Sequence, residues 1–440
     1  MTAVLPERTV RSSTREHAVT AVTSEISDPT VPTDPTVTPA GPVLPALRIG
    51  RHTIESPVVL APMAGITNRA FRRLCREYGD QGRGQAERGS SGAARSVTSL
   101  YVSEMITSRA LVERTPKSMQ LIEHDEDEGF RSIQLYGVDP ATVGAAVRML
   151  VSEDRADHID LNFGCPVPKV TRKGGGAALP WKTDLFRAIL GSAVKEAAAY
   201  DVPVTIKMRK GIDEDHLTFL EAGRIAEGEG VAAVALHART AADAYSGQAD
   251  WSAIRALKEA ITTIPVLGNG DIWSAQDALD MVAATGCDGV VVGRGCLGRP
   301  WLFTDLAAAF AGRTSRVQPT LGEVAQTLRR HTEYLAEFHG NELNACRDIR
   351  KHIGWYLKGF PAGRDVRRRL VLVDSLAALD DLIADLDLDA PWPGEAAEGQ
   401  RGRAGSSRRV ALPDAWLDSR ELNEACAAAV ADAELSVSGG

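Results

Sequence analysis

The chain has 440 residues, of which 44% are hydrophobic and 5% aromatic, and its formal net charge is -8. This composition supplies enough apolar surface for a large core, favours helices alternating with strands over a β-sandwich, and argues against nucleic-acid binding by the molecule as a whole. Six scattered cysteines without a CxxC pair, and no run of about 18 apolar residues, exclude a disulfide framework, a zinc ribbon and a transmembrane helix, so we expect a cytoplasmic protein.

The first 46 residues differ in composition from the rest of the chain. They are rich in Thr, Pro, Val and Ser, have no helical or strand periodicity, and include six prolines from Pro29 to Pro45. Such a segment cannot bury enough apolar surface to offset the entropy lost on ordering. We therefore predict that residues 1–46 form a disordered tail.

Short apolar runs alternate with helical segments from residue 47 to residue 318. Eight such runs, apolar on both faces, predict parallel strands that are covered on both sides. Eight strand–helix units in this length are typical of a closed (β/α)₈ barrel of the TIM type. The alternative is a doubly wound open sheet, which usually has fewer strands and a GxGxxG turn after the first. The predicted strands are Val58–Ala61, Leu100–Val102, Ser132–Leu135, His158–Leu161, Val204–Lys207, Ala233–Leu236, Pro265–Leu267 and Gly289–Val292, and the clearest helices are Asn68–Tyr78, Pro140–Ser152, Thr183–Ala199 and Asp215–Glu229.

One stretch interrupts this alternation between the first helix and the second strand. Residues 80–97 are rich in Gly, Ser and Arg, which predicts a flexible insertion on the side of the barrel opposite the expected active face. Contact with RNA is an alternative role for this basic loop.

The strand signals end after residue 318. Amphipathic helices are predicted over Leu321–Phe338, Leu343–Leu357 and Asp365–Ala384, and we assign them to a small all-helical domain, residues 319–388. Residues 389–440 are rich in Ala, Gly and Glu, which predicts a mostly disordered tail with at most a short helix at Asp418–Ala431.

The candidate site residues follow from the barrel, because reacting groups in this fold lie at the carboxyl ends of the strands. The first strand leads into Pro62, Met63 and Ala64, which form a tight loop that can lie flat against a planar ring. The third strand contains Gln134, whose amide can both donate and accept hydrogen bonds. Taken alone, the loop is better explained as an ordinary turn, and a single glutamine indicates little.

The loop after the fourth strand carries the most specific signal in the chain. It contains Asn162, Cys165 and Lys169, followed by three consecutive glycines that begin at Gly174. A cysteine on a Gly–Pro loop at a strand end is well placed to donate a proton, subject to its local pKa. The alternative, a buried structural cysteine, is expected instead at Cys75, Cys287 and Cys346.

Two titratable side chains end the fifth and sixth strands. Lys207 would be costly to bury without a partner, and an anionic cofactor would satisfy it, although a salt bridge at the barrel rim is the alternative. His237 can donate a hydrogen bond to a ligand and accept one from it. Because no second histidine or carboxylate lies at ligand spacing from His237, we predict no metal site.

Glycine-rich turns follow the seventh and eighth strands. The first is formed by Asn269, Gly270 and Asp271, and the second includes Gly293 and Arg294. Barrels of this kind commonly bind phosphate at these two loops, where backbone N–H groups surround the anion. Together with the strand-end lysine and the loop cysteine, the two turns suggest FMN as a cofactor.

A local excess of positive charge marks the predicted helical domain. Between Arg347 and Arg369, eight basic residues face only Asp348 and Asp365. A basic helical face can hold the phosphates of a nucleic acid, whereas a merely solvated helix face is the alternative. The eight residues are Arg347, Arg350, Lys351, Lys358, Arg364, Arg367, Arg368 and Arg369.

At these residues the chain resembles the tRNA-dihydrouridine synthases, in particular their bacterial B-type branch. The similarity covers roughly residues 47–385, whereas the insertion at 80–97 and both tails depart from the family pattern. The matching stretches are APMAGITNRAFR (61–72), YVSEMITSRAL (101–111), QLYG (134–137), DLNFGCPVPKVTRKGGGAAL (160–179), IKMRKG (206–211), HARTAADAYSG (237–247), GNGDI (268–272), GRGCLGRPW (293–301) and RKHIGWYLKGFP (350–361).

The resemblance implies an enzyme that reduces the C5–C6 double bond of specific uridines in tRNA, with FMN as cofactor and NADPH as reductant. Cys165 would be the general acid that protonates C5 of a uridine flipped out of its stack. We expect a monomer that binds tRNA through the helical domain. The implied FMN contacts are Pro62, Met63, Ala64, Gln134, Lys207, His237, Asn269, Gly270, Asp271, Gly293 and Arg294, and the implied contacts to the uridine and its flanking RNA are Asn162, Lys169, Arg172, Arg350, Lys351 and Lys358.

Two other functions fit parts of the pattern. An FMN barrel that acts on a free pyrimidine, as in relatives of dihydroorotate or dihydropyrimidine dehydrogenase, would share the flavin site but would not need the basic helical domain. A tRNA-binding protein that uses the barrel only as a scaffold would not need Cys165, Lys207 and His237.

Overall fold

The computed structural model describes residues 45–83, 96–402 and 404–434. The predicted N-terminal tail and the centre of the predicted insertion therefore fall outside the described residues, apart from the last two residues of the tail. Within the described ranges, no helix is both long and apolar enough to cross a membrane.

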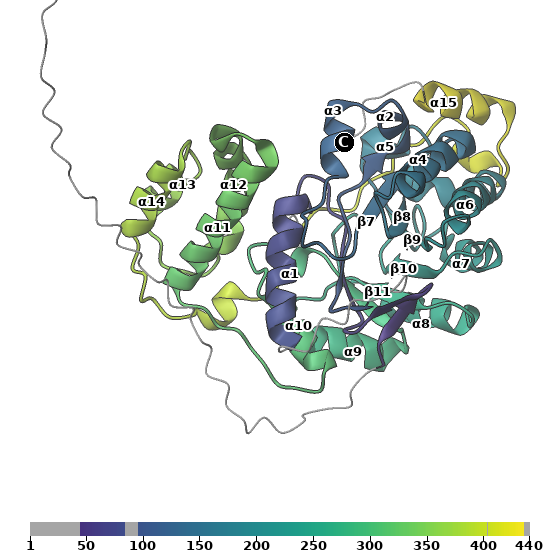
Figure 1. Cartoon of the computed structure of the whole chain (residues 1–440). Helices are drawn as coiled ribbons and strands as arrows, with labels where there is room; N and C mark the ends of the chain where they lie inside the picture. Colours follow the sequence, from purple (N-terminus) through teal and green to yellow (C-terminus); the bar gives the residue numbers. More distant parts are fainter. Residues whose placement is uncertain (1–44, 84–95, 403, 435–440) are drawn as a thin grey trace, which may run out of the picture. The chain divides into compact units, whose positions relative to one another are not determined.

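A closed parallel barrel forms the centre of the structure (Figure 1). Its strands are β3 (Val58–Leu60), β5 (Leu100–Tyr101), β6 (Ile106–Thr107), β7 (Ser132–Tyr136), β8 (His158–Phe163), β9 (Val204–Arg209), β10 (Ala233–His237), β11 (Val266–Asn269) and β12 (Gly289–Val292). They pair in the order β5-β3-β12-β11-β10-β9-β8-β7-β6. The edge strands β5 and β6 are two parts of one interrupted strand, and a parallel bridge between Val102 and Ser132 also joins this strand to β7. The sheet thus closes on itself, which confirms the predicted (β/α)₈ barrel and excludes the open sheet.

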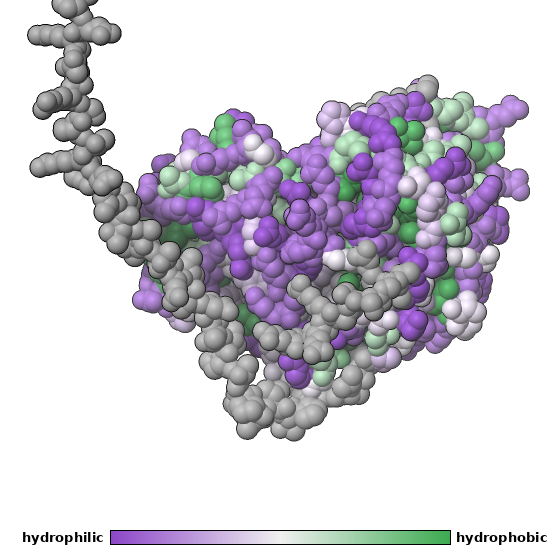
Figure 2. Space-filling model, viewed as in Figure 1, coloured by the Kyte–Doolittle hydropathy of each residue, from purple (hydrophilic) through white to green (hydrophobic). Residues whose placement is uncertain are grey.

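Helices cover the outside of the barrel and turn their apolar sides inward. The face drawn in Figure 2 is accordingly mostly hydrophilic. Helix α9 (Ala275–Thr285) shows how the local sequence sets the ends of a helix. A capping box between Ser274 and Asp277 begins it, and Gly286, with φ of 70°, ends it. The covering helices are α1 (Arg69–Arg83), α2 (Ser108–Val112), α3 (Pro116–Leu121), α4 (Pro140–Ser152), α6 (Thr183–Ala198), α7 (Phe219–Gly228), α8 (Trp251–Ala260), α9 (Ala275–Thr285) and α10 (Leu302–Phe310).

The prediction that residues 80–97 form a flexible insertion is wrong at both ends of this range, where the structure has a helix and a strand. Helix α1 continues to Arg83, because Gly79 and Gly82 allow it to pack closely against neighbouring segments. Ser96–Val97 forms β4, which pairs with β2 (His52–Ile54), and β2 in turn pairs with β1 (Leu47–Ile49). This small sheet contributes Leu47, Ile49 and Ile54 to the core inside the barrel.

Four helices form the C-terminal domain: α11 (Leu321–His339), α12 (Glu342–Tyr356), α13 (Arg364–Leu370) and α14 (Leu376–Ala384). The prediction of a single helix over 365–384 is wrong. The structure has two helices there, α13 and α14, because the first ends before residues 371–374 and Ser375 caps the second. The domain packs on α1, where the Phe71 ring lies 5.4 Å from that of His331 and the Tyr78 hydroxyl lies 2.7 Å from that of Thr327.

The expectation of a mostly disordered tail after residue 389 is wrong for the described residues up to Glu434. This part includes the 3₁₀ turns η3 (Gly394–Ala397) and η4 (Trp416–Asp418) and the helix α15 (Glu424–Glu434), which begins later than the helix predicted from residue 418. Trp416 is only 1% exposed, and Arg401 is 4% exposed. A few buried side chains, widely spaced along the sequence, hold this segment in place. The average composition of the segment does not reveal them, so it did not predict the order.

Candidate active site

A pocket with about 530 Å³ of empty space opens at the carboxyl ends of the barrel strands. Ala64 and Gln134 do not line it: Ala64 is exposed in the loop after β3, and Gln134 is fully buried. The strand-end pattern thus brings together residues that lie far apart in the sequence. Nine of the eleven residues predicted to bind the cofactor line this pocket: Pro62, Met63, Lys207, His237, Asn269, Gly270, Asp271, Gly293 and Arg294.

The backbone of the loop after β11 requires glycine. Gly270 has φ of 133°, and a Cβ on it would lie 2.6 Å from the Cβ of Ala249. The next residue, Asp271, adopts a left-handed conformation with φ of 54°. Its carboxylate holds the loop by accepting hydrogen bonds from the backbone of Ala249, at 2.7 Å, and from Arg239, at 2.8 Å. The result is a tightly wound loop of the kind that presents backbone N–H groups to an anion.

Four cations surround His237 at this pocket: Lys207, Arg209, Arg239 and Arg294. Burial and then the cations hold the pKa of His237 well below its usual value, so its ring is neutral at neutral pH. Burial and the charge of Arg209 lower the pKa of Lys207 to about 8. Lys207 forms no salt bridge with any carboxylate in the described part of the chain. This excess of positive charge favours a ligand that carries negative charge.

Two aromatic residues of the pocket were missed by the sequence reasoning. The guanidinium carbon of Arg294 lies 4.6 Å from the ring centre of Tyr245 and 5.0 Å from that of Trp273. The two rings therefore restrict the Arg294 side chain through cation–π contacts. Tyr245 lies within one of the matched stretches, residues 237–247, so its place in that motif was the available signal.

The loop after β8 presents Cys165 at the same face. Among the six cysteines, all of which are described, Cys165 alone is not fully buried, as expected from its loop, and Cys75, Cys287 and Cys346 are buried as predicted. Partial burial raises the pKa of the Cys165 thiol, although the backbone of Val167 and the charge of Arg209 oppose the shift. The thiol therefore keeps its proton at neutral pH, which is the state that a general acid needs.

Two predicted RNA contacts lie on this same loop. Lys169 is in the short helix α5 (Pro168–Thr171), and Arg172 directly follows it. Both side chains are exposed, and neither forms a salt bridge within the residues that the structure describes. They are thus available to an anionic partner beside Cys165.

The three predicted RNA contacts of the helical domain differ in their surroundings. The guanidinium of Arg350 donates hydrogen bonds to the carbonyls of Leu372 and Val373, at 2.9 and 2.7 Å. Lys358 donates to two carbonyls of the following segment. Lys351 is exposed and reaches the carbonyl of Gly65, in the loop after β3. Of the three, only Lys351 contacts a loop of the barrel's active face.

Comparisons with known proteins identify the family. The family model for dihydrouridine synthases (Dus) matches residues 59–385. A probable tRNA-dihydrouridine synthase of Mycobacterium tuberculosis (strain CDC 1551 / Oshkosh) is 58% identical over 373 residues, which make up 85% of this chain and 92% of the relative. The tRNA-dihydrouridine synthase B of Vibrio vulnificus (strain CMCP6) is 36% identical over 329 residues, or 75% of this chain and 95% of the relative.

Among solved structures, histamine dehydrogenase from Rhizobium sp. 4-9 aligns with 68% of this chain and 51% of its own, at 14% identity and a TM-score of 0.43. This likeness is too weak to bear on function. The family model, by contrast, extends from the first barrel strand to the last helix of the C-terminal domain. The chain therefore belongs to the dihydrouridine synthase family.

Proposed function

We propose that this chain reduces the C5–C6 double bond of uridines in tRNA to 5,6-dihydrouridine, with FMN as cofactor, NADPH as reductant and Cys165 as the general acid. The observation that carries the proposal is a partly exposed thiol, with a pKa that burial raises, on the same face as a pocket rich in positive charge. The relatives named above, which are called tRNA-dihydrouridine synthases, support the same reaction on tRNA.

The residues of the pocket fit FMN. The turns at Gly270 and Gly293, together with Arg294, would hold its phosphate, and Lys207 would face the negative charge of the reduced ring. When bound, reduced FMN supplies the hydride that uracil accepts at C6, and NADPH restores the reduced state. The absence of a salt bridge to Lys207 within the described residues supports this assignment, because an anionic ligand would complete its surroundings.

The chain itself supplies the proton. Hydride addition at C6 moves negative charge towards C5 and O4 of the uracil, so an acid must protonate C5. The raised pKa of the Cys165 thiol keeps this proton in place at neutral pH. A positioned acid contributes a factor of about 10²–10⁴ in rate. Asn162, Lys169 and Arg172 would contact the uridine and its flanking phosphates.

The proposal includes the remaining partners. We propose a monomeric, cytoplasmic enzyme that binds tRNA through the basic side of the helical domain. Lys351 would contribute most directly, because it is exposed and touches the active-face loop at Gly65.

The test measures dihydrouridine in the tRNA of cells that lack this gene and have no second enzyme of the family. Wild type and Cys346→Ala, a control at a buried cysteine of the helical domain, should restore the modification, and Cys165→Ala should not. Unchanged dihydrouridine in the deletion strain would refute the tRNA reaction. Turnover of free uracil or orotate by the purified protein, without turnover of tRNA, would favour the free-pyrimidine reaction instead.

A further inference from the structure

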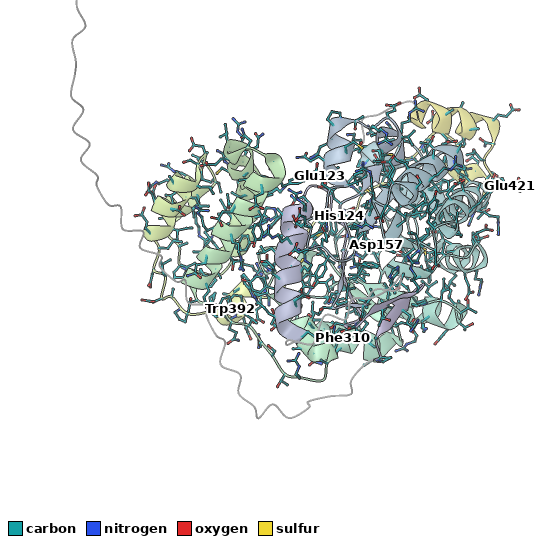
Figure 3. All side chains as sticks on the ribbon, in the orientation of Figure 1. Glu123, His124, Asp157, Phe310, Trp392 and Glu421 are labelled. Carbon is teal, nitrogen blue, oxygen red and sulfur yellow. The ribbon has the colours of Figure 1, made fainter. Side chains whose placement is uncertain are left out.

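The chain crosses the active face of the barrel once more after the helical domain. We call residues 398–423 the C-terminal strap; they lie beyond residue 385, where the family match ends. Successive contacts of the strap are with the loop after β12, the loop after β10 and the Cys165 loop after β8. Because these loops all follow carboxyl ends of strands, the strap runs across that face. In Figure 3, Trp392, which precedes the strap, and Glu421, near its end, lie on opposite sides of the barrel strands.

The first end of the strap is held by a buried arginine. Arg401 is 4% exposed, and its guanidinium donates hydrogen bonds to the carbonyls of Leu297, at 3.3 Å, and Trp355, at 2.6 Å. The next residue, Gly402, passes so close to the pocket residue Arg294 that a Cβ on it would lie 3.4 Å from the Arg294 Cδ. The strap is therefore fixed between the barrel and the helical domain where it enters the active face.

The far end of the strap is held by a buried tryptophan. Trp416 is 1% exposed, and its indole N–H donates to the carbonyl of Ala178 at 3.0 Å. Its ring occupies the space that a side chain on Gly174, in the glycine run of the Cys165 loop, would need. The ammonium of the buried Lys182 donates to the carbonyls of Ser419 and Glu421, at 2.8 and 2.9 Å. Buried contacts thus fix both ends of the strap.

Between these ends the strap passes beside the proton donor. The backbone N–H of Arg408 donates to the carbonyl of Ala242 at 2.9 Å. Its guanidinium lies 3.4 Å from the carbonyl oxygen of Pro166, the residue that follows Cys165. Arg408 and Arg409 are both exposed. The middle of the strap therefore presents two guanidinium groups next to the Cys165 loop.

The middle of the strap carries positive charge, unlike the chain as a whole. Between Gly399 and Pro413 the sequence contains four arginines and no Asp or Glu, although the net charge of the protein is -8. Neither Arg408 nor Arg409 forms a salt bridge within the described residues, and the same holds for Lys169 and Arg172 on the adjacent loop. Four cations without a salt bridge to any described carboxylate therefore lie around the entrance to the proposed uridine site.

We propose that Arg408 and Arg409 bind backbone phosphates of tRNA beside the target uridine, so that the C-terminal strap is a second RNA-binding element besides the helical domain. This inference rests on the proposed function. Guanidinium groups match phosphate oxygens in charge and geometry, and both ends of the strap are anchored, so little additional ordering is needed when RNA binds.

The test uses the full-length, flavin-loaded protein and measures equilibrium binding of unmodified tRNA over a range of salt concentrations. Arg408→Gln/Arg409→Gln should weaken binding by about tenfold and lower the slope of log K against log salt by about 1.4–1.8, which corresponds to two phosphate contacts. The matched control, Lys195→Gln/Arg224→Gln, removes two exposed charges from α6 and α7 and should behave like wild type. Arg409→Gln alone, whose side chain makes no hydrogen bond within the described chain, should give about half of the slope change.

Unchanged affinity and slope in the double variant would overturn the inference. Tighter binding or faster turnover would also overturn it, because the strap would then obstruct the entrance. If the double variant weakens tRNA binding as expected but wild type forms no dihydrouridine, the proposed function fails while the strap remains an RNA contact. If wild type is active and the double variant matches the control, only the strap inference fails.

Discussion

The side-chain oxygen of Asn162 accepts a hydrogen bond of 2.9 Å from the backbone N–H of Cys165. The same oxygen accepts a bond of 3.1 Å from Gly164, and the amide nitrogen donates to Gln134 at 2.8 Å. Gln134 in turn donates to the buried carboxylate of Asp160, whose pKa burial raises to about 6. Both ends of the Asn162 amide are therefore engaged, and the amide ties the Cys165 loop to the buried core of the barrel.

Asn162→Ala should slow dihydrouridine formation because it frees the backbone that holds Cys165. A shift of about 1 Å in a reacting group can cost about 10²-fold in rate, and we expect a loss of that order in kcat. Single-turnover assays with flavin-reduced enzyme measure it. Asn344→Ala, at an exposed position of α12, is the control. A wild-type kcat in Asn162→Ala would show that the amide does not position the thiol.

Lys207→Met should weaken FMN binding, because this ammonium lines the pocket and forms no salt bridge with the described residues. The loss of one charged contact predicts a Kd for FMN raised by about 10- to 100-fold in titrations of flavin-free protein. Lys258→Met provides the control, because that ammonium pairs with Asp288 at 2.7 Å away from the pocket. An unaltered Kd in Lys207→Met would argue against a flavin at this pocket.

The sequence predicts the barrel well because each strand is a short apolar run with a chemically distinctive end. Asn269, Gly270 and Asp271 meet Gly293 and Arg294 in one pocket because parallel strands bring their carboxyl ends together. Long, ordered motifs also carry the family assignment, which the match to residues 59–385 confirms.

The sequence did not predict where individual side chains point. It also did not predict the few contacts that order segments without regular secondary structure. Arg350 and Lys358 count as positive charge in the sequence, yet their side chains bind backbone carbonyls. The strap belongs to the part of the chain that was predicted to be disordered because residues 389–440 are rich in Ala, Gly and Glu. Its order depends on two buried side chains, Arg401 and Trp416, which donate hydrogen bonds to the carbonyls of Leu297 and Ala178 in distant parts of the sequence.

Acid should destabilise the fold through its buried histidines. Burial lowers the pKa of His331 to about 3, whereas an unfolded histidine titrates near about 6.5. Below pH 6.5 the unfolded chain takes up a proton at this histidine, whereas the folded chain does not. The neutral ring therefore makes its full contribution to the free energy of unfolding above pH 6.5, and this contribution is lost as the pH falls towards 3. The free energy of unfolding should fall by about 1.4 kcal/mol per pH unit for this residue.

Urea denaturation between pH 7 and pH 4.5 measures this effect. His331→Phe keeps a ring beside Phe71 but cannot titrate, so its stability should depend less steeply on pH than that of wild type. His216→Gln, at a partly exposed position between β9 and α7, should keep the wild-type slope. Equal slopes for wild type and His331→Phe would mean that His331 does not resist protonation.

Removing one partner of the buried ion pair between Arg72 and Glu128 should destabilise the fold. Arg72 donates to both oxygens of the carboxylate, at 2.8 and 3.0 Å, and the two side chains are 1% and 3% exposed. Arg72→Met leaves a buried carboxylate without its cation, which typically costs about 3–5 kcal/mol. Arg72→Met/Glu128→Leu should recover most of that loss, because it removes the unpaired charge as well. Arg148→Met, which breaks the exposed pair with Glu196, should leave the urea midpoint unchanged. Equal stability of Arg72→Met and the double variant would contradict this prediction. The isolated Glu128 carboxylate would then be hydrated or protonated at no cost in free energy, and the ion pair would not be what holds α1 to the segment before β7.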